Sequence, residues 1–160
     1  MIRSATPADV PRLVELVRAL ADYERSLHEV ELTPDLLHEA VFGTDAVAGV
    51  FVAEQAGAVV GFALWFRTFS TWTGRPGLYL EDLFVEPHAR GAGHGRDLLA
   101  ALAGLAEQRG YRRLDWWVLD WNSPAIGFYR RLGATAMQEW TTYRLTGPAL
   151  RNLGTGLEQT

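Results

Sequence analysis

The sequence predicts an α/β domain in which a mixed, mostly antiparallel sheet carries helices on both faces. Two observations predict it. Segments of strand composition and segments of helical spacing follow one another in the order β-α-α-β-β-β-α-β-α-β, which is neither a regular βαβ alternation nor an all-β pattern. Three consecutive strands in the middle of that order indicate a central meander. A chain of 160 residues is long enough to bury a substantial core in one domain.

The first half of the chain opens with the clearest local signals. Residues 2–5 have the composition of a short strand. Thr6-Pro7-Ala8-Asp9 then forms a capping box with proline at the first helical position, and apolar residues follow at helical spacing as far as Ala21. Thr33-Pro34 starts a second helix in the same manner, which we expect to end near Gly43.

Turn chemistry and periodicity predict the later elements. Gln55-Ala56-Gly57 is a hairpin turn, and residues 70–77 are expected to be a loop. The further predicted strands are residues 47–54, 58–68, 78–85, 113–119 and 140–145, and the further helices are residues 96–109 and 124–132, the latter capped by Asn122 or Ser123. We expect a single domain over residues 1–153 and a flexible tail over residues 154–160.

Composition excludes several classes of protein. The absence of cysteine removes disulfides, thiolate nucleophiles and zinc–thiolate clusters, and it agrees with a cytoplasmic location. The net charge of -4 is the opposite of what a general nucleic-acid binder shows. We expect no membrane span and no signal peptide, because no long apolar run exists and Met1 leads at once into the first strand and helix. His28-Glu29 and His38-Glu39 lack the second histidine of a zinc helix, so we expect no metal.

A glycine-dense turn is the main candidate binding site. Arg90-Gly-Ala-Gly-His-Gly95 joins the strand at 78–85 to the helix at 96–109, so backbone N–H groups and the positive end of a helix dipole meet there. Such a place binds anions, above all phosphate. The spacing lacks the third glycine of the dinucleotide fingerprint and the lysine of the Walker A loop. A flexible turn without a ligand is the alternative interpretation.

The pattern Arg90-x-x-Gly93-x-Gly95 resembles the acyl-CoA pyrophosphate loop of the GCN5-related N-acetyltransferase (GNAT) family. Three segments, 19–24, 78–85 and 121–134, are similar to the diamine (spermidine/spermine) and thialysine N-acetyltransferase branch of that family. The resemblance implies the GNAT fold with a six- to seven-stranded sheet. It also implies an enzyme that moves the acetyl group of acetyl-CoA to a primary amine of a small molecule, by direct transfer in a ternary complex.

The resemblance further implies roles for individual residues. Glu81 would be the base that deprotonates the amine, directly or through water, and Tyr129 would be the acid that protonates the leaving thiolate. The expected substrate contacts are Tyr23, Glu24, Trp72 and Asp82. The expected acetyl-CoA contacts are the backbone of Leu83, Phe84 and Val85, the loop residues Arg90, Gly91, Ala92, Gly93, His94, Gly95 and Arg96, and the segment Asn122, Ser123, Pro124 and Ala125.

The chemistry of the reaction explains why these residue types are needed. A primary amine has a pKa of about 10, so it must lose a proton before it can attack a thioester at neutral pH. A tyrosine hydroxyl suits the protonation of a thiolate, and backbone N–H groups suit the oxyanion. In a regular strand Glu81 and Asp82 would point to opposite faces, but a β-bulge would re-aim one of them. The alternatives are a core salt bridge for Glu81 and core packing for Tyr129.

Two departures from the diamine branch bear on the substrate. The loop Phe69-Ser-Thr-Trp72 lacks an acidic residue two positions before the tryptophan, and Thr141 stands where a substrate-binding glutamate is expected. A long polyamine needs carboxylates along its length, so a lysine-like amino acid or another small primary amine fits better. The alternatives are a protein or peptide N-acetyltransferase and a non-catalytic acyl-CoA-binding module on the same fold. The branch also implies a homodimer, by pairing or exchange of the strand at 140–145.

Overall fold

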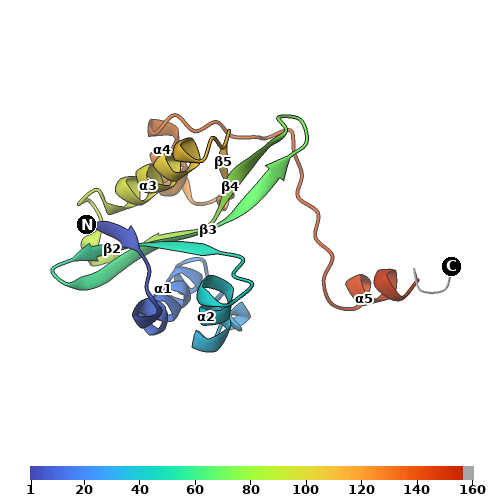
Figure 1. Ribbon diagram of the computed structural model, residues 1–160, viewed down its shortest axis with the longest axis horizontal. Coiled ribbons are helices and arrows are strands. Elements are labelled where there is room, and N and C mark those ends of the chain that lie inside the picture. Colours follow the sequence, from blue (N-terminus) through green and yellow to red (C-terminus); the bar gives the residue numbers. More distant parts are fainter. Residues whose placement is uncertain (157–160) are drawn as a thin grey trace. The chain divides into compact units, whose positions relative to one another are not determined.

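A computed structural model describes residues 1–156 of the chain. These residues form two compact units, the first from Met1 to Trp117 and the second from Val118 onward, and each is described by itself (Figure 1). No helix within residues 1–156 is long and apolar enough to cross a lipid bilayer.

The first unit is built on a five-stranded sheet in the order β1-β2-β3-β4-β5. The strands are β1 (Ile2–Ser4), β2 (Gly49–Gln55), β3 (Ala58–Ser70), β4 (Arg75–Val85) and β5 (Leu114–Trp116). Strands β1 to β4 pair antiparallel with their neighbours, and β5 runs parallel to β4. The predicted mixed, mostly antiparallel sheet with a central meander is therefore confirmed.

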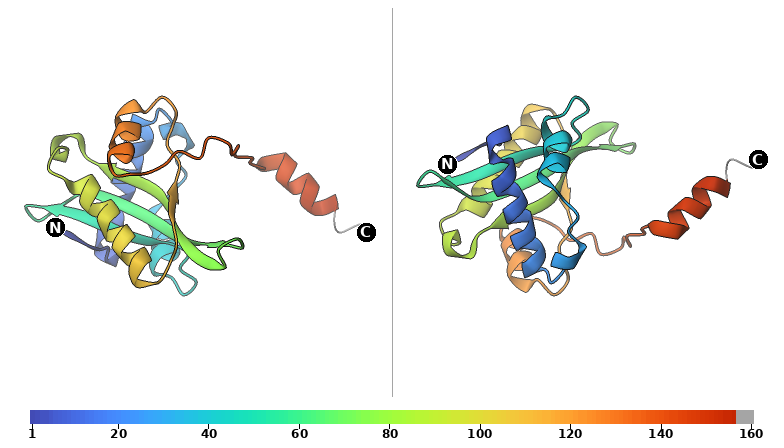
Figure 2. Two further views of the ribbon diagram at one scale, coloured as in Figure 1. Left: turned by 90° about the horizontal axis from the view of Figure 1, so that it is seen from above. Right: turned by 90° about the horizontal axis from the view of Figure 1, so that it is seen from below.

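Helices cover both faces of this sheet, as predicted. The helices α1 (Val10–Tyr23) and α2 (Pro34–Phe42) lie on one face, and α3 (His94–Gln108) lies along the other (Figures 1 and 2). The main core lies between the first two helices and the sheet, where Leu13, Leu16, Leu37, Val52 and Phe62 are almost completely buried. Burial of such side chains stabilises the fold by roughly 1.5–3 kcal/mol each.

The start of the first helix forms as the capping box predicts. The backbone N–H of Thr6 donates a hydrogen bond of 2.7 Å to the carboxylate of Asp9, although the first turn, Pro7–Asp9, is a 3₁₀ turn that precedes α1. Arg3 of β1 also binds Asp9 at 2.8 Å and Glu54 of β2 at 2.9 Å. The hydrogen bonds from Arg3 hold the pKa of Asp9 well below its usual range. The Arg3 guanidinium thereby connects strands β1 and β2 to the turn that precedes α1.

The central strands run longer than the composition of the turn suggests. The residues 70–77 are not one long loop, because β3 continues to Ser70 and β4 begins at Arg75, with the register Ser70 to Arg75 still paired. The predicted strand at 113–119 is shortened to β5, because its ladder with β4 ends at the pair of Leu80 and Trp116.

The second unit contains α4 (Ser123–Arg131) and α5 (Gly147–Gly156). The cap of α4 is the predicted one, since the Asn122 side-chain oxygen accepts a hydrogen bond from the Ala125 backbone N–H at 3.3 Å. The predicted tail begins inside α5, which the glycine-rich composition had not indicated, and residues 157–160 lie outside the described residues. A single domain over residues 1–153 stays a prediction.

The predicted strand at 140–145 is wrong for the part of the chain that the structure describes. The segment has no regular secondary structure, and Tyr143 is 93% exposed. A strand needs a neighbour for its backbone N–H and C=O groups, and the described residues of the second unit form no other strand. The sheet of residues 1–156 accordingly has five strands rather than the expected six or seven.

Candidate active site

Strand β4 carries a β-bulge at Glu81. Its register with β3 pairs Asp82 with Leu64 and Leu80 with Trp65, so Glu81 is an extra residue without a partner on β3. A bulge interrupts the alternation of side chains between the two faces of a sheet. The two adjacent carboxylates, Glu81 and Asp82, are therefore not forced to opposite faces, which is the arrangement that the sequence allowed.

The carboxylates at the bulge influence one another electrostatically. Burial, and then the negative charges of Glu81 and Glu24, raise the pKa of Asp82 to about 7. Glu24 is the residue that caps the end of α1, and burial also raises its pKa. The structure thus brings Glu24, Glu81 and Asp82 into one region. A carboxyl with a pKa near 7 can exchange a proton at neutral pH, which an ordinary aspartate does not do.

The edge of β4 beyond Leu80 is open within the first unit. Strand β5 pairs only with residues Leu78 to Leu80, so the segment from Glu81 to Val85 has β3 on one side and no strand of the first unit on the other. Leu83 and Val85 are half-buried and Phe84 is buried, as a core strand requires. An extended ligand with amide groups can pair with the backbone of such an edge.

The glycine turn ends in a helix start without a side-chain cap. Gly91 and Gly93 have φ angles of 84° and 90°, in the left-handed region, and Gly93 is the N-cap of α3. Because glycine has no side chain, no cap hydrogen bond reaches the first-turn N–H groups at His94, Gly95 and Arg96. A Cβ added at Gly91 would have no heavy atom within 4 Å. Glycine is therefore favoured at this position by its positive φ angle and not by a lack of space for a side chain.

Two side chains of the glycine turn are held by other elements. Arg90 donates a hydrogen bond from Nε to the Val85 carbonyl at 2.9 Å, and its guanidinium lies over the rings of Tyr23, at 5.2 Å, and Phe84, at 5.7 Å. Arg90 therefore connects the end of β4 and the end of α1. His94 forms a hydrogen bond of 2.8 Å between Nε2 and the side-chain oxygen of Gln55, a residue of the β2–β3 hairpin that sequence analysis did not identify.

The remaining predicted residues lie as follows. Tyr23 is the last residue of α1, next to Glu24, and Trp72 lies in the turn between β3 and β4 with 89% of its surface exposed. In the second unit, the segment Asn122–Ala125 forms the start of α4, and Tyr129 lies on the same helix with its ring 5.3 Å from that of Phe128. Their proposed contacts with acetyl-CoA and substrate stay predictions.

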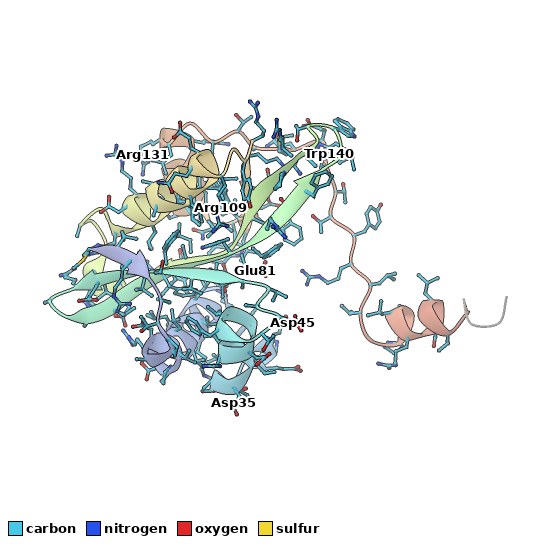
Figure 3. All side chains as sticks on the ribbon, viewed as in Figure 1. Asp35, Asp45, Glu81, Arg109, Arg131 and Trp140 are labelled. Atoms are coloured by element: carbon cyan, nitrogen blue, oxygen red, sulfur yellow. The ribbon has the colours of Figure 1, made fainter. Side chains whose placement is uncertain are left out.

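A cavity of about 850 Å³ opens beside the bulge, within the size range of small-molecule sites. Glu81 lines it together with residues that sequence analysis did not identify, among them Trp65 and Arg67 of β3 and Arg109 at the end of α3. Figure 3 labels Glu81 and Arg109. No local motif marks these three residues, since they are brought together only by the packing of α3 on the sheet. Within residues 1–156, no three His, Asp or Glu side chains are arranged to hold a metal ion.

Comparison with known proteins agrees with this geometry. Residues 13–134 match the model of the acetyltransferase (GNAT) family. The chain is 35% identical to a thialysine N-epsilon-acetyltransferase of Mus musculus, with 95% of each chain covered, and 30% identical to the L-ornithine N5-acetyltransferase NATA1 of Arabidopsis thaliana, with 94% of this chain and 86% of the relative covered. A solved structure, the integron cassette protein VCH_CASS6 from the mobile metagenome of V. cholerae, has a TM-score of 0.80 at 28% identity, with 96% of each chain covered.

The match covers most of the chain and includes the bulged strand, the glycine turn and the start of α4. Members of this family use acetyl-CoA as their co-substrate. The chain belongs to the GNAT acetyltransferase family, in the branch of the diamine and thialysine N-acetyltransferases, and is an N-acetyltransferase.

Proposed function

We propose that this enzyme transfers the acetyl group of acetyl-CoA directly to the primary amine of a small molecule, foremost the side-chain amine of a lysine-like amino acid. The observation that carries the proposal is the β4 bulge, where Glu81 and Asp82 lie beside the strand edge that β5 leaves open. The names of the relatives, which act on thialysine and on ornithine, support a small amine as the acceptor.

The Glu81–Asp82 pair is proposed to receive the proton of the substrate ammonium. Asp82, with a pKa of about 7, is a much better proton acceptor for a group of pKa near 10 than an ordinary aspartate. Glu81 lies next to it on the exposed side, where it can take the proton directly or through water. Glu24 and Tyr23 are the proposed further contacts of the substrate cation, and Trp72 is proposed to approach it from the β3–β4 turn.

The residues present also fit acetyl-CoA at two places. The uncapped N-terminus of α3, from Arg90 to Arg96, offers backbone N–H groups to a pyrophosphate, and the positive end of the helix dipole favours that charge. The open backbone of Leu83, Phe84 and Val85 offers hydrogen bonds to the amides of the pantetheine arm and an N–H to the thioester oxygen. The segment Asn122–Ala125, at the start of α4, is the proposed third contact.

The proposed reaction needs no covalent intermediate on the protein. The amine nitrogen bonds to the acetyl carbon and loses its second proton to solvent, and the carbon–sulfur bond breaks. The thiolate takes a proton from the Tyr129 hydroxyl, which recovers one from solvent. An ammonium and acetyl-CoA thereby give an amide, free CoA thiol and one proton. Tyr129→Phe should lower kcat by roughly 10- to 10⁴-fold with little change in acetyl-CoA affinity. An unchanged rate would remove Tyr129 from the mechanism.

A panel of acceptors tests the function itself. The purified chain is mixed with acetyl-CoA and with amino acids, diamines or short peptides, and the release of free thiol is followed. Turnover of small amines is the expected result. Turnover of peptides alone would identify a protein N-acetyltransferase, and CoA binding without any turnover would identify a non-catalytic module.

Two further features belong to this proposal. We propose that the enzyme is a homodimer, in which the exposed segment around Tyr143 packs against a second copy. Light scattering on the purified chain checks this, and a monomer at all concentrations would contradict it.

A cytoplasmic location is proposed from the absence of cysteine, since exported proteins commonly contain disulfides.

A further inference from the structure

The cavity beside the β4 bulge has charges of both signs on its wall. Glu81 lines it from β4, Arg109 from the end of α3 and Arg67 from β3, and the rest of the wall is mainly apolar. Figure 3 labels Glu81 and Arg109, which come from elements that meet at this cavity. A ligand that carries only positive charge would find one partner and two repulsive groups here. A ligand that carries both charges would find a partner for each.

Arg109 is held in place without being neutralised. Its guanidinium lies over the Trp65 ring, 5.6 Å from the ring centre, and this cation–π contact orients the side chain. Within residues 1–156 no carboxylate lies within ion-pair distance of it. The backbone N–H of Arg109 closes α3 through a bond of 3.1 Å to Leu105, so the position is fixed by the helix as well.

Glu81 is the matching unpaired charge on the same wall. It forms no ion pair with any described residue, and its electrostatic neighbours are Asp82 and Tyr79. No hydrogen bond or ion pair joins Glu81 to Arg109 within the described residues. A carboxylate and a guanidinium on one small-molecule cavity, each without a partner, match a ligand that has an ammonium at one end and a carboxylate at the other.

We propose that Arg109, oriented by Trp65, binds the α-carboxylate of an amino-acid acceptor whose side-chain amine faces Glu81, and that it thereby selects amino acids over diamines. This inference rests on the proposed function, because it assigns the acceptor to the cavity at Glu81. Arg67 is the only other cation on the cavity wall within the described residues, and it adds to the preference for an anionic group. A polyamine gains nothing from either arginine.

Matched substrate pairs test this selectivity. L-Ornithine and 1,4-diaminobutane, like L-lysine and 1,5-diaminopentane, have the same amine chain with and without the carboxylate. We expect the wild-type enzyme to have the higher kcat/KM for the amino acid of each pair. Arg109→Gln should lower kcat/KM for the amino acids by roughly 10- to 100-fold, mainly through KM, because one charged hydrogen-bond partner is lost. The values for the diamines should stay unchanged or rise.

Arg112→Gln is the matched control. It removes the same charge from an exposed arginine three positions along the chain that does not line this cavity, and it should change neither substrate class. Arg109→Lys keeps the charge without the planar fork and should recover part of the amino-acid activity. Thermal melts of all variants distinguish a loss of folding from a loss of substrate recognition. If Arg109→Gln does not fold, Arg109→Lys provides the test of recognition.

Two results would overturn the role of Arg109 and leave the proposed function intact: wild-type enzyme that acetylates diamines as well as amino acids, or Arg109→Gln enzyme that loses both activities equally. A wild-type enzyme that binds acetyl-CoA and acetylates no amine would instead contradict the proposed function.

Discussion

A single extra residue in β4 changes what its neighbours can do. Without the bulge, the alternation of the strand would separate Glu81 from Asp82, and each would be an ordinary carboxylate on its own face. With the bulge, burial and then the charges of Glu81 and Glu24 raise the pKa of the half-buried Asp82 to about 7. Asp82 is therefore a proposed proton acceptor beside Glu81, which the motif alone did not indicate.

The pH dependence of activity follows from this pKa. Protonated Asp82 cannot accept a proton, so kcat/KM of the wild-type enzyme should rise with pH through an inflection near 7. Asp82→Asn should remove that inflection and lower kcat/KM by roughly 10²- to 10⁴-fold. Steady-state rates between pH 5.5 and 9 measure both effects, with Asp35→Asn, an exposed aspartate of α2, as the control. An unchanged inflection in Asp82→Asn would assign the titration to another group.

The same group makes a prediction about stability. Because the pKa of Asp82 is higher in the folded chain than its ordinary value, the folded chain binds a proton between about pH 4 and 7 that the unfolded chain releases. Stability contributed by this site is therefore lost as the pH rises through that window. Asp82→Asn, which stays neutral, should be more stable than wild type at pH 8, on the order of 2 kcal/mol after allowance for partial exposure, and nearly equal to it at pH 4. Thermal melts at the two pH values check the sign.

Arg90 makes contacts within the protein that the motif does not indicate. The pattern predicts a phosphate ligand, and in the structure its Nε also bonds to Val85 and its guanidinium lies over Tyr23. Arg90→Ala should therefore weaken two functions at once, since the glycine turn and the end of α1 both lose their connection. We expect KM to rise for acetyl-CoA and for the amine, with a combined loss of roughly 30-fold in kcat/KM.

Initial rates with each substrate varied in turn measure this. Arg90→Lys, which keeps the cation over the ring but loses the Nε bond, should fall between wild type and Arg90→Ala. A rise of KM for acetyl-CoA alone would show that Arg90 acts only as a phosphate ligand.

At the scale of elements, the start of α3 shows why a short motif is sufficient to predict exposed backbone N–H groups at the start of a helix. A left-handed glycine at the N-cap, followed directly by a helix, exposes N–H groups whatever the rest of the fold does. The same local logic explains why capping boxes and glycine stops located α1, α2, α3 and α4 within a few residues. It fails at the segment 140–145, because a strand is stabilised by a partner that no local pattern can reveal.

Gly93, the N-cap of α3, and Gly104, inside the helix, provide a matched pair of substitutions. Gly93→Ala places a Cβ at a φ of 90°, which costs roughly 1–2 kcal/mol and should distort the turn that is proposed to receive the pyrophosphate. Gly104→Ala, in the middle of the same helix with nothing within 4 Å of its Cβ, should stabilise the fold by about 0.5–1 kcal/mol. Calorimetric CoA titrations should show weaker binding for the first variant only. Equal CoA affinity in both would remove the turn from the site.

At the scale of the whole molecule, ligand binding is linked to stability. If acetyl-CoA binds the folded chain through the α3 turn and the open edge of β4, a concentration of 100 times Kd should add about 2.7 kcal/mol to the free energy of unfolding. For a chain of this size that is a rise in Tm of roughly 5–10 °C. Differential scanning fluorimetry with acetyl-CoA, with adenosine as a control that lacks the pyrophosphate, measures it. No shift at saturating acetyl-CoA would contradict the binding site.

The sequence by itself determined the order of elements as far as α4, the class of sheet, the glycine turn and the family, because each depends on turn chemistry, periodicity or residues that are close along the chain. The tertiary structure alone decided the number of strands in the described residues and the pKa of Asp82. It also placed Arg109 over Trp65 on the same cavity as Glu81. These features depend on which segments pack together and on how much water they exclude. Neither quantity is encoded in a local pattern, so no sequence motif identifies Arg109 at the end of α3 as a residue of this cavity.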